Sequence, residues 1–213
     1  MKTVICSHGF GVRADSRGMF PEIAAAFPDY EFTLFDYCEI TPSGDTVLRP
    51  LEEQAEILQR HINDAPDGEI VLLGHSMGCV VAGLVDLSRV SKVVLLAPPE
   101  VMHNRLQQWL KERPGSHFDS DGTFVLPRTD DTTSYLPPAY MASIEHKDPM
   151  ELYQNIANSK PTLIVRATND EVIGLTNVDK IKNAQHIDIA ADHNFTGASR
   201  GELLEALRAK TFQ

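Results

Sequence analysis

The 213-residue sequence has few cysteines and no long hydrophobic run. Its three cysteines, Cys6, Cys38 and Cys79, are an odd number without metal-site spacing, so we expect free thiols and a reducing cytoplasm rather than a disulfide framework. Cys6 and Cys79 lie in apolar runs and should be buried, whereas Cys38 is a candidate reactive thiol near a strand end. No apolar run reaches membrane-span length, and the N-terminal one is too short for a signal peptide.

The sequence also lacks an excess of positive charge. Its formal net charge is −11, and no cluster of lysine and arginine offsets that value locally. This balance excludes a general affinity for nucleic acid or for anionic membrane surfaces. Apolar and charged contents are ordinary for a globular protein, and the length suits one domain over residues 1–213. No pattern indicates an oligomeric state.

Short apolar runs alternate with amphipathic stretches along most of the chain. Such alternation indicates βα units, and hence an α/β fold with a parallel sheet and helices on both faces. Strands are expected over six ranges: 2–7, 30–37, 70–73, 92–97, 162–167 and 186–190. Helices are expected over four ranges: 16–27, 51–62, 79–85 and 201–209.

One turn combines glycines with a candidate nucleophile. Gly74-His75-Ser76-Met77-Gly78 joins the buried strand over 70–73 to the apolar helix over 79–85. A serine held at positive φ in so tight a turn brings neighbouring backbone close, and side chains at positions 74 and 78 would clash. The alternative is a glycine-rich turn that carries a surface serine. The sequence favours a nucleophile at Ser76.

Residues from about 100 to 160 break the βα alternation. A helix over 101–113 is expected to end at Pro114-Gly115, and a hairpin over 117–128 turns at Ser120-Asp121-Gly122. Asp148-Pro149 predicts another helix, because Asp is a preferred N-cap and Pro a preferred first helical residue.

The strand, Gly-x-Ser-x-Gly turn and helix together resemble the nucleophile elbow of the α/β-hydrolase family. The resemblance implies a minimal α/β-hydrolase fold with a mostly parallel six-stranded sheet, because the chain opens on the strand that carries the oxyanion-hole turn. The family's first two antiparallel strands would then be absent. It also implies a cap, or lid, over residues 100–160, inserted after the strand ending near Ala97. An ordinary long crossover is the alternative for that segment.

Two later residues suit a serine nucleophile, which needs a base and a group that orients the base. Asp170 follows the strand over 162–167, and His193 follows the final strand. Catalytic groups gather at the carboxyl ends of strands in open parallel sheets. Ser76, Asp170 and His193 also have the family's chain order of nucleophile, acid and base.

Other residues compete for these roles. Glu100, after Pro98-Pro99, is the rival for the acid, because some family members take their acid there. Asp192 adjoins His193 but cannot easily fold back onto its neighbour's ring. His8 and His75 are expected to support turns, and His186 begins the last strand at its wrong end.

The resemblance further implies that an oxyanion hole is formed by the backbone N–H groups of Phe10 and Met77. Phe10 belongs to His8-Gly9-Phe10-Gly11, the turn that leaves the first strand. Gly9-Phe10-Gly11 lacks the third glycine of a dinucleotide fingerprint. Substrate-lining candidates in the expected cap are Met102, Trp109, Tyr135, Tyr140 and Tyr153.

These residues predict a serine hydrolase, with a carboxylesterase as the leading interpretation. The segment from Asp121 to Pro138 loosely resembles the hairpin-bearing insertion of small bacterial carboxylesterases, including feruloyl esterases. The expected partner is a small-molecule ester with a small acyl group, aromatic groups among the candidates, and neither a metal nor an organic cofactor is expected. A peptidase, thioesterase, carbon–carbon bond hydrolase or non-catalytic binding module on the same fold remains an alternative.

Overall fold

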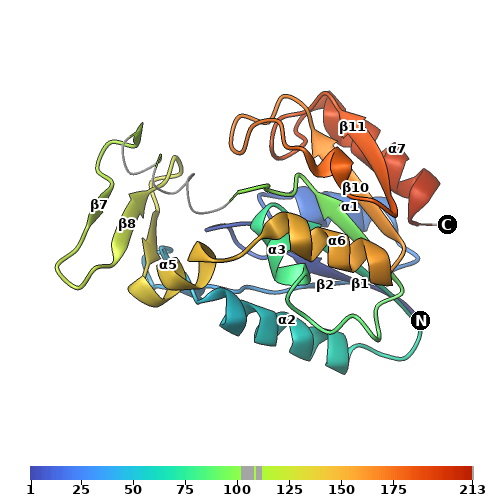
Figure 1. Cartoon of the computed structure of the whole chain (residues 1–213), viewed down its shortest axis with the longest axis horizontal. Helices are drawn as coiled ribbons and strands as arrows, with labels where there is room; N and C mark the ends of the chain where they lie inside the picture. Colours follow the sequence, from blue (N-terminus) through green and yellow to red (C-terminus); the bar gives the residue numbers. More distant parts are fainter. Residues whose placement is uncertain (102–107, 109–111, 213) are drawn as a thin grey trace.

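The computed structural model describes residues 1–101, 108 and 112–212, and its main element is a parallel sheet (Figure 1). Six strands in the described residues pair in the order β11-β10-β6-β5-β1-β2, and every pair is parallel. The predicted six-stranded sheet is therefore confirmed. The strands are β1 (Lys2–Ser7), β2 (Glu31–Leu34), β5 (Glu69–His75), β6 (Lys92–Leu96), β10 (Thr162–Ala167) and β11 (Ala184–Ile189).

Helices cover both faces of this sheet (Figure 1). One face carries α2 (Leu51–Asp64), α3 (Met77–Ala82) and α6 (Pro149–Ser159), and the other carries α1 (Met19–Ala26) and α7 (Ala198–Lys210).

Each central strand contributes side chains to both faces in turn. In β1, Ile5 belongs to the first of two buried apolar clusters, whereas Val4 and Cys6 belong to the second. In β5, Leu72 belongs to the first cluster and Val71 to the second. A strand buried on both faces therefore reads as a continuous apolar run.

The predicted elements match the structure best in the sheet interior. The ranges 2–7 and 162–167 are reproduced residue for residue. Helix α1 begins three residues later than expected, because Ser16 and Arg17 have positive φ values of 47° and 57°. The helix expected over 101–113 lies mostly outside the described residues.

A second sheet lies beyond one end of the main sheet (Figure 1). Its strands pair in the order β3-β4-β9-β8-β7. The predicted hairpin is present as β7 (His117–Phe118) and β8 (Phe124–Pro127), and β9 (Thr133–Leu136) follows.

The other two strands of the second sheet come from a distant segment. No helix or strand was expected between 37 and 51, but this stretch contains β3 (Glu39–Ile40) and β4 (Thr46–Val47). Strand β4 pairs in parallel with β9. The hydroxyls of Thr46 and Ser134 lie 2.9 Å apart at this junction, and the Asp45 carboxylate accepts the backbone N–H of Thr133 at 2.7 Å.

Two helices connect the second sheet to the main one. Helix α5 (Pro138–Glu145) was not expected from the sequence. Helix α6 begins as predicted, because the Asp148 side chain accepts the backbone N–H groups of Met150 and Glu151. Tyr140 and Tyr153 are buried, so these helices belong to the core.

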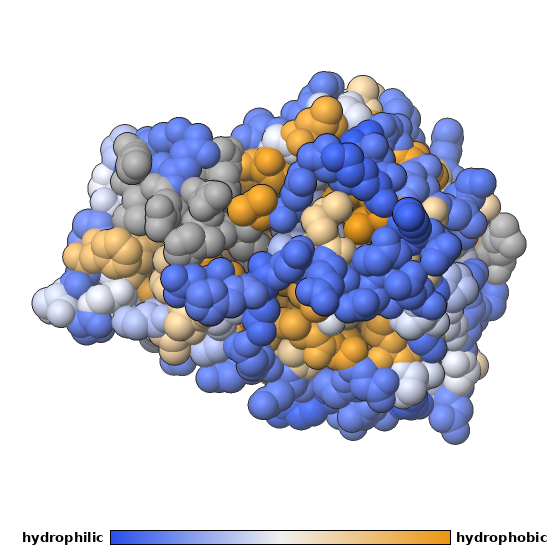
Figure 2. Space-filling view, viewed as in Figure 1, coloured by the Kyte–Doolittle hydropathy of each residue, from blue (hydrophilic) through white to orange (hydrophobic). Residues whose placement is uncertain are grey.

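The surface is mostly hydrophilic on the face seen in Figure 2. This agrees with the strongly acidic composition. Among the helices that the structure describes, none is both long and apolar enough to cross a membrane.

Candidate active site

Ser76 lies in a strained turn between β5 and α3. Its φ and ψ are 53° and −125°, a conformation that residues with a Cβ rarely adopt. The turn is held from both sides, because the N–H of Ser76 donates to the oxygen of Leu96 and the N–H of Cys79 donates to the oxygen of Ser76, both at 2.9 Å. The positive φ expected from the sequence is therefore present.

The two flanking glycines leave room for backbone. A Cβ on Gly78 would lie 2.0 Å from the oxygen of Ser7, and one on Gly74 would lie 3.1 Å from the backbone of Cys79. Helix α3 is also tied to β1 at this point, because Ser7 Oγ donates to the oxygen of Gly78 at 2.8 Å. The predicted steric need for glycine at positions 74 and 78 is confirmed.

Asp170 and His193 meet at the carboxyl ends of β10 and β11. The Nδ1 atom of His193 lies 2.6 Å from Oδ2 of Asp170. The other carboxylate oxygen of Asp170 accepts the backbone N–H groups of Val172 and Ile173 at 2.9 and 2.8 Å. These three contacts fix the carboxylate against the imidazole, so Nδ1–H is the donor and Nε2 is left to face another group.

Glu100, the rival acid, forms its hydrogen bonds with Asn177. Its carboxylate accepts the backbone N–H of Asn177 at 3.0 Å and the side-chain amide of the same residue at 2.9 Å. This contact ties the residues after β6 to the loop after Asp170. The geometry favours Asp170 as the partner of His193.

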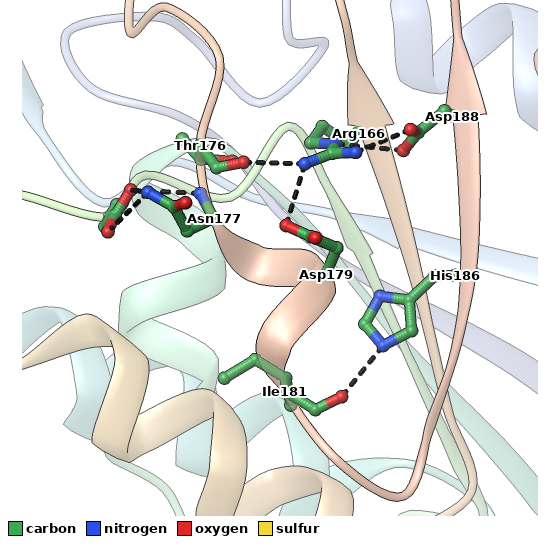
Figure 3. A network of polar contacts seen from close by, with 8 residues as sticks. Arg166, Thr176, Asn177, Asp179, Ile181, His186 and Asp188 are labelled. Atoms are coloured by element: carbon green, nitrogen blue, oxygen red, sulfur yellow. Dashed lines mark hydrogen bonds and ion pairs between the residues drawn. The ribbon is translucent and has the colours of Figure 1, made fainter.

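The loop that follows Asp170 is anchored by an ion-pair network (Figure 3). Arg166 on β10 binds Asp188 on β11 and Asp179 in the short helix η1 (Val178–Lys180), and it donates to the oxygen of Thr176 at 2.8 Å. Hydrogen bonding to Asp188 raises the pKa of Arg166 and lowers that of Asp188. His186 donates to the oxygen of Ile181 at 2.8 Å, as a supporting residue.

His75 and Arg200 hold the backbone around His193. The Nε2 atom of His75 lies 3.0 Å from the oxygen of His193, and its Nδ1 lies 3.0 Å from Oγ of Ser16. Arg200, from α7, donates to the oxygens of Phe195 and Asn194 at 3.0 and 2.8 Å. The supporting role expected of His75 is thus confirmed, whereas no sequence signal identified Arg200.

The turn over residues 8–11 approaches Ser76 from β1. A Cβ on Gly9 would lie 3.1 Å from the Cβ of Ser76. His8 supports the turn as expected, because its Nε2 accepts the N–H of Tyr37 at 3.0 Å while Nδ1 donates to the oxygen of Gly9 at 2.9 Å. Burial lowers the pKa of His8, so it is neutral in this arrangement.

The two expected oxyanion donors lie on the turn that carries Ser76 and on the turn over residues 8–11. Met77 is the first residue of α3, where N–H groups have no intrahelical carbonyl to bind. The thioether of Met77 accepts the hydroxyl of Tyr140 at 3.0 Å. Phe10, on the opposite turn, packs its ring 6.0 Å from that of Tyr140.

Ser76 and His193 share a cavity with a volume of about 330 Å³. Phe10, Met77 and Tyr140 line it too, so both expected oxyanion donors and one expected pocket residue meet there. Tyr135 does not line this cavity, and its backbone oxygen instead accepts the N–H of Leu48 at 2.9 Å. Met102 and Trp109 lie outside the described residues, and Tyr153 donates its hydroxyl to the oxygen of Pro99 at 3.1 Å.

The sequence did not point to most of the other lining residues. Three of them are arginines, Arg17, Arg113 and Arg128, which come from separate loops and share no motif. The others are Gly9, Val12, His75, Pro99, Val101, Thr129, Glu171, Val172, Ile173 and Asn194. Within the described part of the chain, no three His, Cys, Asp or Glu side chains are placed to hold a metal ion.

Comparison with known proteins agrees with the observed fold. A family model described as "Alpha/beta hydrolase family" matches residues 4–196. A protein of Mycoplasma genitalium, provisionally named an esterase/lipase, is 31% identical over 111 residues, or 46% of this chain. The chain matches only 36% of that relative's length.

The solved structures share the fold at low identity. Est1E from Butyrivibrio proteoclasticus has a TM-score of 0.70 and 18% identity, covering 98% of this chain and 86% of its own. Est1E with bound ferulic acid has a TM-score of 0.70 and 16% identity, covering 100% of this chain and 90% of its own.

Proposed function

The chain belongs to the alpha/beta hydrolase family, and from this we propose that it is a serine hydrolase that cleaves carboxylic esters through an acyl-enzyme on Ser76. One observation carries the proposal: a histidine paired with a buried carboxylate shares a cavity with a serine in a strained strand-to-helix turn. That combination is what a weak serine nucleophile needs for activation.

In the proposed reaction, Ser76 Oγ attacks the ester carbonyl carbon while Nε2 of His193 takes the hydroxyl proton. Asp170 accepts Nδ1–H of His193 and stabilises the imidazolium that forms. The tetrahedral intermediate collapses as the carbon–oxygen bond to the alcohol breaks, and His193 returns the proton to the leaving alkoxide. A water molecule, deprotonated by His193, then attacks the acyl carbon; the bond to Ser76 Oγ breaks, His193 returns the proton to that oxygen, and the acid is released.

Two backbone N–H donors are needed to stabilise the negative charge that develops on the carbonyl oxygen in the tetrahedral intermediate. We assign these donors as the N–H groups of Phe10 and Met77, because both residues line the cavity that holds Ser76 and each adjoins a residue at or against the nucleophile. Fixed donors of this kind need no reorganisation as charge develops, and losing one costs about two to three decades in kcat.

The segment over residues 100–160 is proposed to act as the cap that selects the acyl group. Described residues of this segment that line the cavity include Arg113, Arg128 and Tyr140. The cavity of about 330 Å³ suits a small ester. An aromatic acyl group is a candidate, since the structural relative Est1E binds ferulic acid and the rings of Phe10 and Tyr140 lie together here.

Hydrolysis of p-nitrophenyl acetate and butyrate tests the proposal. The native protein should release p-nitrophenol, and Ser76→Ala should reduce the rate to background. A fluorophosphonate probe should label the native protein but neither Ser76→Ala nor His193→Ala. Turnover that persists in Ser76→Ala would contradict the proposal, and an inert native protein that binds no probe would favour a binding module.

A panel of thioesters and peptides, assayed beside the esters, distinguishes carboxylesterase activity from that of the family's other hydrolases. The highest kcat/KM should be for an oxygen ester. Faster turnover of thioesters or peptides would retain the serine mechanism but change the reaction assigned to it.

A further inference from the structure

The cavity around Ser76 is lined by three arginines in a protein whose net charge is −11. They are Arg17 in the loop after β1, and Arg113 and Arg128 in the 100–160 segment. Only one carboxylate is found in the described lining, that of Glu171, and it accepts the backbone N–H of His193 at 3.0 Å. The local charge of the described lining is therefore opposite to that of the molecule.

Arg128 lies against the turn over residues 8–11. Its guanidinium carbon is 5.8 Å from the centre of the Phe10 ring, and Nη1 lies 3.1 Å from where a Cβ on Gly11 would be. The missing side chain at Gly11 leaves room for the guanidinium against the turn over residues 8–11. Arg128 therefore borders the same turn that carries the Phe10 N–H.

Arg128 lacks a counterion among the described residues. No ion pair joins its guanidinium to a carboxylate in the described chain, although the group is half-buried. Burial, together with the nearby charges of Arg17 and Arg113, lowers the pKa of Arg128 to about 10. Asp130 acts in the opposite sense, but its carboxylate binds the N–H and hydroxyl of Thr132.

A half-buried guanidinium without a carboxylate, beside two further guanidiniums, is electrostatically unfavourable unless an anion joins it. Arginine is suited to such an anion, because its planar donors match a carboxylate in a two-pronged hydrogen bond. Arg113 also donates to the oxygen of Pro127 at 3.3 Å, which sets its loop beside the end of β8.

We propose that Arg128, assisted by Arg17 and Arg113, binds a carboxylate group of the substrate, so that the preferred esters carry a negative charge. This inference rests on the proposed ester hydrolysis at Ser76. The carboxylate belongs either to the acyl part, as in a dicarboxylic acid monoester, or to the alcohol part. Screening by salt limits the repulsion from the acidic surface to about 8 Å at physiological ionic strength.

Two matched pairs of esters test the charge preference and its position. Monoethyl adipate against diethyl adipate places the carboxylate on the acyl side, and 4-acetoxybenzoate against its methyl ester places it on the alcohol side. The charged member of at least one pair should have a kcat/KM at least tenfold higher than the neutral member. Added salt should reduce that ratio.

Substitutions assign the preference to the arginines. Arg128→Gln should lower the charged-to-neutral ratio of kcat/KM at least tenfold, and Arg128→Lys should lower it less. Arg17→Gln supplies a second test at an exposed position. Arg60→Gln removes an exposed arginine from α2, outside the cavity lining, and should leave the ratio unchanged. Thermal unfolding of each variant shows whether it remains folded.

Binding supplies a readout that does not depend on turnover. Calorimetry with Ser76→Ala should show monoethyl adipate or 4-acetoxybenzoate binding at least tenfold more tightly than its neutral partner, and Arg128→Gln should remove the difference. Native protein that hydrolyses neutral esters but shows no charge preference overturns this inference and leaves the proposed function standing. If the native protein hydrolyses no ester, the proposed function fails. Equal binding of the charged and neutral esters to Ser76→Ala overturns the charge preference, whether or not any ester is hydrolysed.

Discussion

His75 donates its Nε2–H to the backbone oxygen of His193, 3.0 Å away. Its other ring nitrogen lies 3.0 Å from Oγ of Ser16 and accepts from that hydroxyl. The residue before the proposed nucleophile thus holds the backbone of the proposed base, and it does so as a neutral imidazole. A second proton would place a charge in a buried site where the described hydrogen-bond partners of the ring, Ser16 and the His193 oxygen, include no carboxylate.

This neutral state makes stability depend on pH. Burial lowers the pKa of His75 from 6.5 to about 3, so between these values the unfolded chain binds a proton that the folded chain does not. The free energy of unfolding should therefore fall as pH drops below 6.5, by up to about 1.4 kcal/mol per pH unit from this group. The lowered pKa of His8 acts with the same sign.

Urea unfolding at pH values from 4 to 7 measures this dependence. His75→Gln keeps an amide donor for the His193 oxygen but removes the titrating group. Unfolding of this variant should therefore take up about one proton fewer than unfolding of the native protein, and its free energy of unfolding should depend less steeply on pH. Equal pH slopes in the two proteins would contradict a buried neutral His75.

The carboxylate of Asp170 is expected to be essential for kcat. Asp170→Asn replaces the acceptor that holds Nδ1–H of His193, which favours the wrong imidazole tautomer and should lower kcat by about 10⁴. The matched control is Glu100→Gln, which alters the rival acid and should change kcat by less than about tenfold. Ester hydrolysis by both purified variants decides the assignment, and a reversed order of effects would return the role to Glu100.

Gly78 should tolerate no side chain. In Gly78→Ala the new methyl group would meet the backbone of Ser7 and His8, so α3 must move away from β1. We expect a loss of about 3 kcal/mol or more in the free energy of unfolding, the upper range for overpacking.

Gly201 provides the matched control for that substitution. It lies in α7, and a Cβ there would meet nothing within 4 Å. Gly201→Ala should raise the free energy of unfolding by about 0.5–1 kcal/mol, because alanine is the better helix former. Chemical denaturation of the two variants side by side measures both effects, and similar stabilities would show that α3 is not pressed against β1.

The three cysteines should resist thiol reagents in the folded protein. All three are free and buried, including Cys38, which the sequence left as a candidate reactive thiol. Burial raises the pKa of Cys38 to about 12, and it raises the pKa of Cys6 and Cys79 as well. Ellman's reagent at pH 8 should therefore label the thiols of the native protein slowly. In denaturant, it should label all three thiols rapidly. Rapid native labelling of one thiol would place Cys38 in contact with solvent.

The main sheet was predictable because its central strands are buried on both faces. An apolar run such as 162–167 has a strong signal of its own, and the ends of the run mark the ends of β10. The contact between Asp170 and His193 was predictable from the same strand assignments, because parallel strands bring their carboxyl ends to one edge of the sheet.

The second sheet and the arginines were harder to predict. Strands β3 and β4 contain two residues each, too few to show a period of two, and β4 exists through pairing with a strand far along the chain. The three arginines reach the cavity from separate loops, so no spacing in the sequence relates them. The pairing of β4 with β9 and the convergence of the three arginines are both long-range contacts, so only the folded structure reveals them.

The pairing of β4 with β9 has a consequence for engineering and for evolutionary exchange. Because the second sheet is shared between residues 39–47 and residues 117–136, the 100–160 segment is not a self-contained cassette. Grafting a relative's insertion in its place would leave Thr46 and Val47 without β9, one of the two strands that pair with β4. A transplant intended to change substrate preference therefore has to carry both pieces of chain, and natural variation in one piece should be accompanied by change in the other.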